Sequence, residues 1–294
     1  MANLKAIRIR LSSVRSTRQI TAAMKMVSAA KLRKAQDKIV QLRPYVKKLS
    51  EILIGVTQSL AESQVENVYA RNSEPEKILL VVITSNRGLC GAFNSNVIKE
   101  TRRIVAEKYH EQFSKNNVTL LTIGKKGYDY FRKLNFKMLP DQNALFNNLT
   151  FENVVLVAEG IMESFVSGDY DRVELVYNQF KNAAVQNLTD ETFLPVRAVS
   201  SADNKSLPVD YIYEPAKEDI VKELIPKTLK IQFYKAVLDS FVAEHGARMT
   251  SMHKATDNAT SMIHDLTLQY NKARQAAITN QILEVVSGAE ALKG

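Results

Sequence analysis

The sequence predicts an α/β protein: a long antiparallel coiled coil of two helices, one from each end of the chain, plus a central Rossmann-like α/β domain. Two observations predict this fold. Both ends of the 294-residue chain carry a narrow apolar stripe at alternating steps of three and four residues. Between the stripes, strand patterns alternate with helical patterns. The predicted segments are residues 1–60, 75–214 and 216–294, of which the first and last form one rod.

The amino-terminal helix is predicted from Asn3, a good capping residue, to about Leu60. Its stripe consists of Leu32, Ala35, Ile39, Leu42, Val46, Leu49, Leu53, Val56 and Leu60. A first apolar face precedes this stripe, at Ile7, Leu11 and Val14. After a change of phase near Arg18, that face is expected to continue through Ile20, Met24 and Val27. Pro44 removes one backbone hydrogen bond, so the helix is expected to bend there without ending.

The carboxyl-terminal helix carries the second stripe, which consists of Met249, Met252, Thr256, Ala259, Ile263, Leu266, Tyr270, Ala273 and Ala277. Each stripe keeps its phase over about four heptads, far beyond the mean helix of about 12 residues, and therefore needs a partner. The other end of the same chain is the simplest partner. Beyond the stripe, apolar residues continue without clean spacing, at Ile278, Ile282, Leu283, Val285 and Val286. They predict an apolar tip that other subunits enclose.

The middle of the chain predicts a small, largely parallel sheet. Strands are expected at 77–84, 118–123, 172–180 and 193–199, and helices at 96–113, after Gly127 and at 151–166. Residues 208–215 are typical of an extended edge or linker. Pro226 is expected to be an early residue of the last helix, which extends to about Val286.

The excess positive charge lies at the amino terminus. The chain has a formal net charge of +9, and residues 1–48 contain 13 Lys or Arg but one acid, Asp37. A solvated helix face would mix both signs, so this basic face favours an acidic protein partner over nucleic acid or a membrane. An organelle transit peptide is the alternative interpretation of this composition.

No pattern in the chain assembles a catalytic or metal site. The turn from Arg87 to Gly91 follows a buried strand but matches neither the dinucleotide fingerprint nor the P-loop. Gly124-Lys-Lys-Gly127 is typical of a strand-to-helix turn with solvated lysines, and the four histidines are expected at the surface. The single Cys90 is expected to be a small buried side chain, excludes an intrachain disulfide and fits a reducing compartment. No apolar run is long enough to span a bilayer. We expect no cofactor.

Three stretches resemble the gamma subunit of F-type ATP synthases, in its bacterial form. In the first helix they are Ser13-Val14, Thr17, Gln19-Ile20-Thr21, Ala23 to Val27, Lys31-Leu32 and Arg43-Pro44-Tyr45. In the last helix they are Ala247-Arg248-Met249, Ala255 to Ala259, Tyr270 to Thr279 and Gly288-Ala289. Thr84 to Gly91 is similar to the loop of that family's α/β domain. Asn86 and Gln281 depart from the family's Asp and Glu, and no dithiol insert is present.

The resemblance implies a central stalk that turns inside a ring of alpha and beta subunits and attaches to epsilon and to the membrane ring of c subunits. It implies no chemistry in the chain itself: proton-driven rotation would be coupled to ATP synthesis or hydrolysis at the beta subunits, at the cytoplasmic face of the bacterial plasma membrane. The residues implied in beta-subunit contacts are Ile20, Met24, Lys25, Arg248, Gln275, Thr279 and Gln281. The coupling ion, proton or sodium, is not set by the sequence.

Two other functions stay open on the residues alone. The basic first helix is compatible with a nucleic-acid-binding coiled-coil protein, which salt-sensitive retention on DNA would reveal. The central sheet is compatible with a nucleotide-dependent enzyme, which ATP turnover by the isolated chain would reveal.

Overall fold

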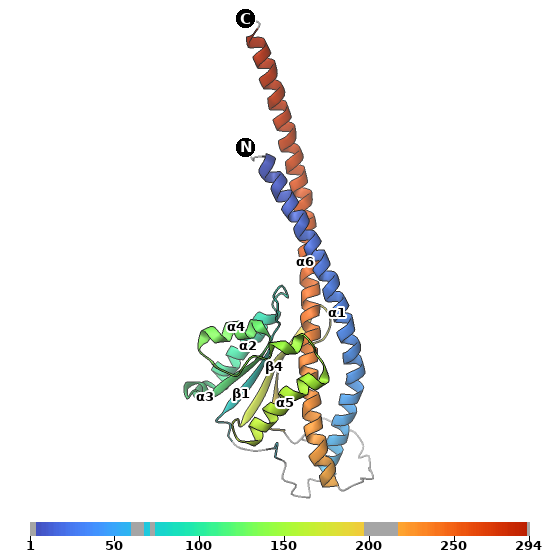
Figure 1. The fold of residues 1–294 in the computed structure, drawn as a ribbon, viewed down its shortest axis with the longest axis vertical. Helices are drawn as coiled ribbons and strands as arrows, with labels where there is room; N and C mark the ends of the chain where they lie inside the picture. Colours follow the sequence, from blue (N-terminus) through green and yellow to red (C-terminus); the bar gives the residue numbers. More distant parts are fainter. Residues whose placement is uncertain (1–3, 60–67, 71–73, 197–216, 293–294) are drawn as a thin grey trace. The chain divides into compact units, whose positions relative to one another are not determined.

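The computed structural model describes residues 4–59, 68–70, 74–196 and 217–292 (Figure 1). Its contacts divide the chain into two compact units. The helical unit takes the described residues up to Ala29 and from Arg248 onward, and the mixed unit takes those from Ala30 to Ala247. The predicted linker at 208–215 lies outside the described residues. The domain boundaries predicted at 1–60, 75–214 and 216–294 stay a prediction.

Two long helices contribute to both units. α1 spans Leu4–Ser59 and continues through Pro44, and α6 spans Lys217–Ala291 and continues through Pro226. Their lengths of 56 and 75 residues agree with one long helix at each end. α6 ends five residues beyond the expected Val286 and begins nine residues before Pro226, so this proline lies inside the helix and not at its start.

The helical unit is an antiparallel pair of helices, with the N-terminus of α1 and the C-terminus of α6 directed the same way (Figure 1). On α6 beyond the buried Arg248, the buried residues recur every seven positions, at Met252, Ala259 and Leu266. On α1 they are Ile7, Leu11, Thr21 and Ser28. Heptad spacing on both helices is the pattern of a coiled-coil seam.

The expected change of phase near Arg18 is wrong. The buried positions of α1 keep one phase from Ile7 through Thr21 and Ser28. Two small hydroxyl residues therefore occupy seam positions where an apolar side chain was expected. The apolar residues nearby lie off the seam, with exposed fractions of 59% at Ile20, 67% at Met26 and 58% at Val27. Hydrophobicity, used alone, selected the wrong face of the helix.

The mixed unit contains a five-stranded sheet in the order β3-β2-β1-β4-β5. The strands are β1 Ile78–Ile83, β2 Val118–Ile123, β3 Lys137–Met138, β4 Arg172–Phe180 and β5 Gln186–Leu194. β1, β2, β3 and β4 run parallel, and β5 pairs antiparallel with β4. The prediction of a largely parallel α/β sheet is confirmed.

Short helices connect these strands. They are α2 Phe93–Glu107, α3 His110–Ser114, α4 Lys125–Phe131, α5 Phe151–Val166 and the 3₁₀ turns η1 Arg132–Leu134 and η2 Asn143–Phe146. Every residue of β1 and β2 is buried, as expected for strands covered on both faces. One core cluster joins the strands to the inner face of α2, through Ile78, Leu80, Val97, Ile104 and Leu120.

Within the mixed unit α6 is a central core element. From Ala236 to Ala247 every residue is buried except the half-buried Phe241. Aromatic pairs join the helix to η2, α5 and β5, namely Phe241 with Phe146, Tyr234 with Phe151 and Phe233 with Phe193, with ring centroids 5.4–5.9 Å apart. A helix that is buried on nearly every side is held as part of the core.

The surface position expected for His245 is therefore wrong. The side chain is 5% exposed, and its ring meets the ring of Phe241 edge to face at 4.5 Å. His110, His253 and His264 are exposed. Spacing along the helix could not reveal that a sheet covers this stretch of α6.

Candidate functional site

The sheet of the mixed unit has a switch point between β1 and β4, where α/β folds of this type usually bind a ligand. The chain runs from β1 to β2 and β3 on one side and returns to β4 and β5 on the other. The segment after β1 supplies Cys90 and Phe93, and the end of β4 supplies Phe180. These three residues pack against Ala243 and Ala247 of α6. The usual nucleotide position is thus filled by the chain's own helix.

Gly246 allows this close approach of α6. A Cβ atom at residue 246 would lie 3.2 Å from the carbonyl oxygen of Ala183, in the turn after β4. The Asn178 side chain of β4 donates a hydrogen bond to the carbonyl oxygen of Phe93 at 3.0 Å, which ties β4 to the start of α2. The switch point is therefore filled by close packing between α6, β4 and the start of α2.

The amino-terminal end of α4 is also satisfied from within the chain. Thr84 Oγ1 accepts a hydrogen bond from the Gly127 amide at 2.9 Å, and Asn86 Oδ1 accepts one from the Lys125 amide at 3.0 Å. These amides are among the donors that a helix start could offer to a phosphate. Lys125 and Lys126 are exposed to solvent, in agreement with the expected turn.

Asn86 also gives a structural reason for one departure from the family pattern. Its Nδ2 atom donates to the carbonyl oxygen of Asn143 at 3.0 Å, while Oδ1 accepts from Lys125. An aspartate could accept but could not make the first bond. The amide therefore joins the β1 loop to η2.

The neighbouring Cys90 is 2% exposed, and Asn94 Nδ2 lies 3.3 Å from its sulfur. This agrees with a small buried side chain.

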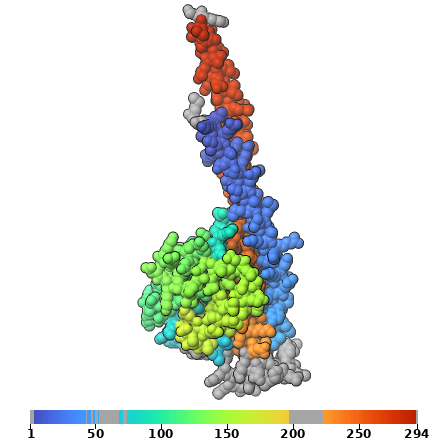
Figure 2. Space-filling view, in the orientation of Figure 1, coloured from blue at the N-terminus to red at the C-terminus, as the bar shows by residue number. Residues whose placement is uncertain are grey.

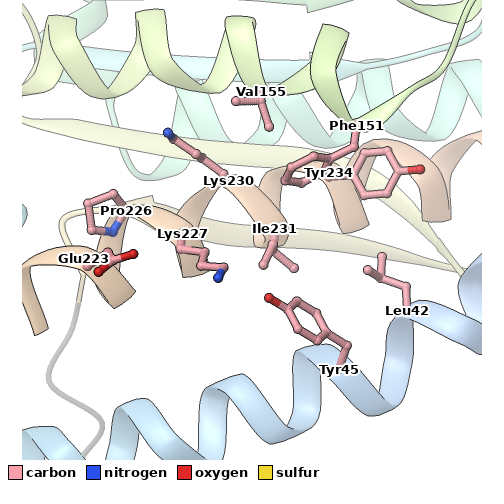
Figure 3. A pocket seen from close by; sticks show the side chains of 10 residues that line it. All are labelled: Leu42, Tyr45, Phe151, Val155, Glu223, Pro226, Lys227, Lys230, Ile231 and Tyr234. Carbon is pink, nitrogen blue, oxygen red and sulfur yellow. The ribbon is translucent and has the colours of Figure 1, made fainter. Parts of the chain in front are cut away.

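A cavity of about 810 Å³ lies within the mixed unit between α1, α5 and α6 (Figure 3). Leu42, Val155 and Ile231 supply apolar walls, and the Tyr45 hydroxyl and the Lys227 ammonium point toward each other across the gap (Figure 3). Lys230 Nζ is 2.6 Å from Glu159 Oε1, so this lysine is held in an ion pair. Burial raises the pKa of the lining Tyr234, with a further contribution from Glu152. This lining offers an apolar surface and no nucleophile beside a base.

The residues that the family resemblance implies in beta-subunit contacts lie in the helical unit, and all but Arg248 are at least partly exposed. Ile20, Gln275, Thr279 and Gln281 are exposed, Met24 and Lys25 are half-buried, and Arg248 is 7% exposed. Arg8, Arg10, Arg15 and Arg18 are exposed, and their guanidinium groups form no hydrogen bond or ion pair with the described residues. Exposed Ile20 and Val27 thus share this part of α1 with uncompensated positive charge.

The end of α6 presents a second apolar surface. The exposed fractions are 48% at Ile278, 57% at Ile282, 58% at Leu283, 72% at Val285 and 52% at Val286. Figure 2 shows that α1 does not cover these last turns of α6 on the visible face of the helical unit. An apolar stretch of this length needs a cover in solution.

Within the described ranges no group of three or more His, Cys, Asp or Glu residues is placed to hold a metal ion. No described helix is both long and apolar enough to cross a membrane. Sequence reasoning missed Thr21 and Ser28 as seam residues, and the unbroken heptad count from Ile7 would have found both. It also missed the capping roles of Thr84 and Asn86.

The ATP synthase family matches residues 3–292. The chain is 56% identical over 294 residues to the ATP synthase gamma chain of Flavobacterium johnsoniae, and 46% identical to that of Geobacter metallireducens, with both proteins covered completely in each comparison. The mitochondrial ATP synthase central stalk and c ring of Tetrahymena thermophila contains a chain with a TM-score of 0.57 and 25% identity, covering 80% of this chain and 99% of that one. A chain of the Euglena gracilis mitochondrial ATP synthase rotor has the same fold, with a TM-score of 0.62 and 21% identity over 94% and 98%. The chain belongs to the ATP synthase gamma-chain family.

Proposed function

We propose that the chain is the central-stalk rotor subunit of an F-type ATP synthase. It couples proton-driven rotation of a membrane c ring to ATP synthesis or hydrolysis on beta subunits and performs no chemistry itself. The observation that carries this proposal is the bare apolar end of α6, where Ile282, Leu283 and Val285 are each more than half exposed. A sleeve formed by alpha and beta subunits would cover it.

The filled switch point supports a mechanical role for the mixed unit. α6 passes through its core, held by the Cys90, Phe93 and Phe180 cluster and by three aromatic pairs. A force applied to the sheet would therefore reach α6 through close packing. We assign this unit to the attachment that joins epsilon and the c ring to the rotor, and with it a peripheral position at the cytoplasmic face of the bacterial plasma membrane.

The helical unit would act by contacting each beta subunit in a different way. An axle that carries Ile20 and unpaired arginines on one helix presents different chemistry to each of three surrounding beta subunits. A contact that favours one nucleotide affinity over another shifts the population of that subunit, and rotation moves the bias to the next one. Met24, Lys25, Arg248, Gln275, Thr279 and Gln281 are the further residues that we propose for these contacts.

Rotation of a labelled complex tests this function directly. Leu156 on α5 is 68% exposed whereas Cys90 is 2% exposed, so Leu156→Cys supplies one reactive thiol for a bead. The variant is co-expressed with alpha and beta subunits, immobilised through beta and supplied with ATP. We expect stepwise rotation in one direction, and the parent chain with Cys90 alone should bind no bead. ATP hydrolysis by a labelled complex whose bead never turns would refute the proposal.

The isolated chain provides the complementary test. It should neither hydrolyse ATP nor remain on immobilised DNA at physiological salt, because its switch point is filled and its basic face lacks a groove-reading element. ATP turnover by the chain alone would instead support a nucleotide-dependent enzyme.

A further inference from the structure

A second candidate interaction surface lies at the β3 edge of the sheet, where residues from α4 and from the turn after α3 also contribute. A hollow of about 500 Å³ opens there. We call it the basic hollow, and its lining consists of Asn116, Tyr128, Arg132, Asn135, Phe136, Lys137 and Met138. None of these residues belongs to the switch point or to the helical unit.

The floor of the basic hollow is apolar. Phe136 and Met138 are half-buried and pack against the core cluster of the sheet. The Phe136 ring lies 5.0 Å from the Phe113 ring and 5.3 Å from the Phe131 ring, so its position is fixed from two sides. Phe113, whose ring contacts Phe136, is 42% exposed, and Leu134, next in the chain to the lining residue Asn135, is 45% exposed. Such a floor favours an apolar side chain of a ligand.

The rim is cationic. Arg132 and Lys137 line the hollow, and Lys115 and Lys133 are next in the chain to lining residues. All four are exposed, and their charged side-chain groups form no ion pair or hydrogen bond with the described residues. The nearest acids along the chain, Glu111, Asp129 and Asp141, form no ion pair with these cations among the described residues. A complementary ligand would therefore carry carboxylates on both sides of its apolar group.

The third feature is an open strand edge. β3 is the outermost strand of the described sheet and pairs only with β2, through Lys137 opposite Thr119 and Met138 opposite Leu120. Its other backbone edge has no strand beside it in the described part of the chain. An extended peptide can add to such an edge by main-chain hydrogen bonds while its side chains enter neighbouring hollows.

We propose that the basic hollow docks an extended acidic segment of a partner protein, with one apolar side chain of that segment on the Phe136 and Met138 floor. Carboxylates flanking that side chain pair with Arg132 and Lys137, and the segment's backbone lies along β3. An anionic membrane could satisfy the cations but supplies neither a single apolar side chain nor a backbone to pair with β3. This surface is additional to the rotor function and does not depend on it.

Peptide binding to the full chain tests the proposal. The probe is a fluorescein-labelled Glu-Asp-Glu-Phe-Glu-Asp-Glu peptide, followed by fluorescence anisotropy at low salt. Three comparison peptides replace the Phe by Gly, every acid by Gln, or alternate amide hydrogens by methyl groups. We expect each change to weaken binding about tenfold or more, because each removes one of the three complementary features. Equal binding of the Gly peptide or the methylated peptide would refute the side-chain hollow or the strand pairing respectively.

Two protein variants locate the site. Arg132→Gln combined with Lys137→Gln should raise the dissociation constant about tenfold, the sum expected for two ion pairs at a partly apolar surface. Lys125→Gln combined with Lys126→Gln, which removes two exposed charges at the other end of α4, is the matched control and should change it less than about twofold. The four positions are exposed, so all variants should keep the thermal transition of the parent. An equal loss in both pairs would reduce the binding to general charge and overturn the proposal.

Vesicles of phosphatidylglycerol test whether the basic hollow binds an anionic membrane instead. Binding of vesicles that needs Arg132 and Lys137, together with no binding of the acidic peptide, would show a membrane surface and refute the peptide site. Rotation of the assembled complex is read out separately, so failure here leaves the rotor function untouched.

Discussion

Thr21 and Thr256 face each other across the two helices of the helical unit, with their Oγ1 atoms 2.9 Å apart. Each hydroxyl also reaches a carbonyl oxygen of its own helix, that of Arg18 at 3.1 Å and that of Met252 at 2.8 Å. One hydroxyl therefore donates across the pair while the other donates to its own backbone. A polar contact at one seam position makes other registers of the helix pair costly, because a shifted register would bury both hydroxyls against apolar groups.

A double-mutant cycle tests this contact. Thr21→Val and Thr256→Val should each lower the free energy of unfolding by about 0.5–1.5 kcal/mol, and the double variant should lose less than the sum by about 0.5–1 kcal/mol. Urea unfolding followed by circular dichroism gives the energies.

Thr17 and Thr260 form the control pair, since both are exposed and bond only within their own helices, to Ser13 and to Thr256. The changes in unfolding free energy caused by Thr17→Val and Thr260→Val should add in the double variant. If the unfolding free energies lost by Thr21→Val and Thr256→Val simply add, the two hydroxyls do not stabilise each other.

The two candidate faces of α1 show where sequence reasoning reached its limit. The fold class and the long helices followed from periodicity, because four heptads of regular spacing rarely occur outside a long helix with a buried seam. Between Ile7 and Leu32 the same method failed, since the seam there uses Thr21 and Ser28 while Ile20 and Val27 lie outside it. Exposed apolar residues at helical spacing look like a seam in the sequence. The exposed Ile20 therefore points to a partner more strongly than to a core.

In the sheet, too, some strands were predicted correctly and others were missed or misplaced. β2 at 118–123 and β4 at 172–180 agree with the predicted ranges, because apolar and β-branched residues dominate both strands. β5 begins at Gln186, seven residues before the predicted start, since one face of this edge strand is polar. β3 has two residues, too few for any pattern, and the predicted helix at 96–113 is divided into α2 and α3. The packing of α6 into the switch point depends on contacts between distant segments, which spacing along the chain does not encode.

Gly124, which lies between β2 and α4, should be among the least replaceable glycines of the mixed unit. Its φ of +117° is rarely adopted by other residues, and an added Cβ would lie 2.1 Å from the carbonyl oxygen of Thr84. Gly124→Ala should lower the free energy of unfolding by more than about 3 kcal/mol. Gly160→Ala is the control: nothing lies within 4 Å of its added Cβ in α5, so the unfolding free energy should rise by about 0.5–1 kcal/mol. A tolerated Gly124→Ala would show that the loop can move away from Thr84.

Tyr109 should give the fold a dependence on alkaline pH. Its hydroxyl donates to Glu174 Oε1 at 2.6 Å, and burial, with the hydrogen bond to Glu174 second, raises the pKa of Tyr109. The phenol of the unfolded chain ionises near pH 10, while the folded one stays protonated. The stability from Tyr109 is therefore complete below about pH 10 and declines as the pH rises toward the raised pKa.

Tyr109→Phe should cost about 1–3 kcal/mol at pH 8, because the buried Glu174 loses its donor. Above pH 10 the difference from the parent should shrink, by at most about 1.4 kcal/mol per pH unit. Urea titrations at pH 8, 10 and 11 measure this trend. Tyr128→Phe, which removes a phenol without a hydrogen-bond partner among the described residues, should leave the unfolding free energy nearly unchanged. A difference at Tyr109 that grows with pH would contradict the sign argued here.

Deleting the residues after Ala277 should impair coupling far more than folding. Residues 278–292 are all exposed, so their removal takes almost no buried surface from the helical unit. We expect a nearly unchanged thermal transition of the isolated chain but weaker assembly with alpha and beta subunits and slower proton-driven ATP synthesis in vesicles. A finer version is Ile282→Ser with Val285→Ser, compared with Leu156→Ser, an equally exposed apolar residue of α5. The tip pair should reduce synthesis severalfold and the control should not, because only the tip is expected to lie inside the ring. Full proton-driven synthesis by both the truncated complex and the tip pair would remove the need for any cover around this end of α6.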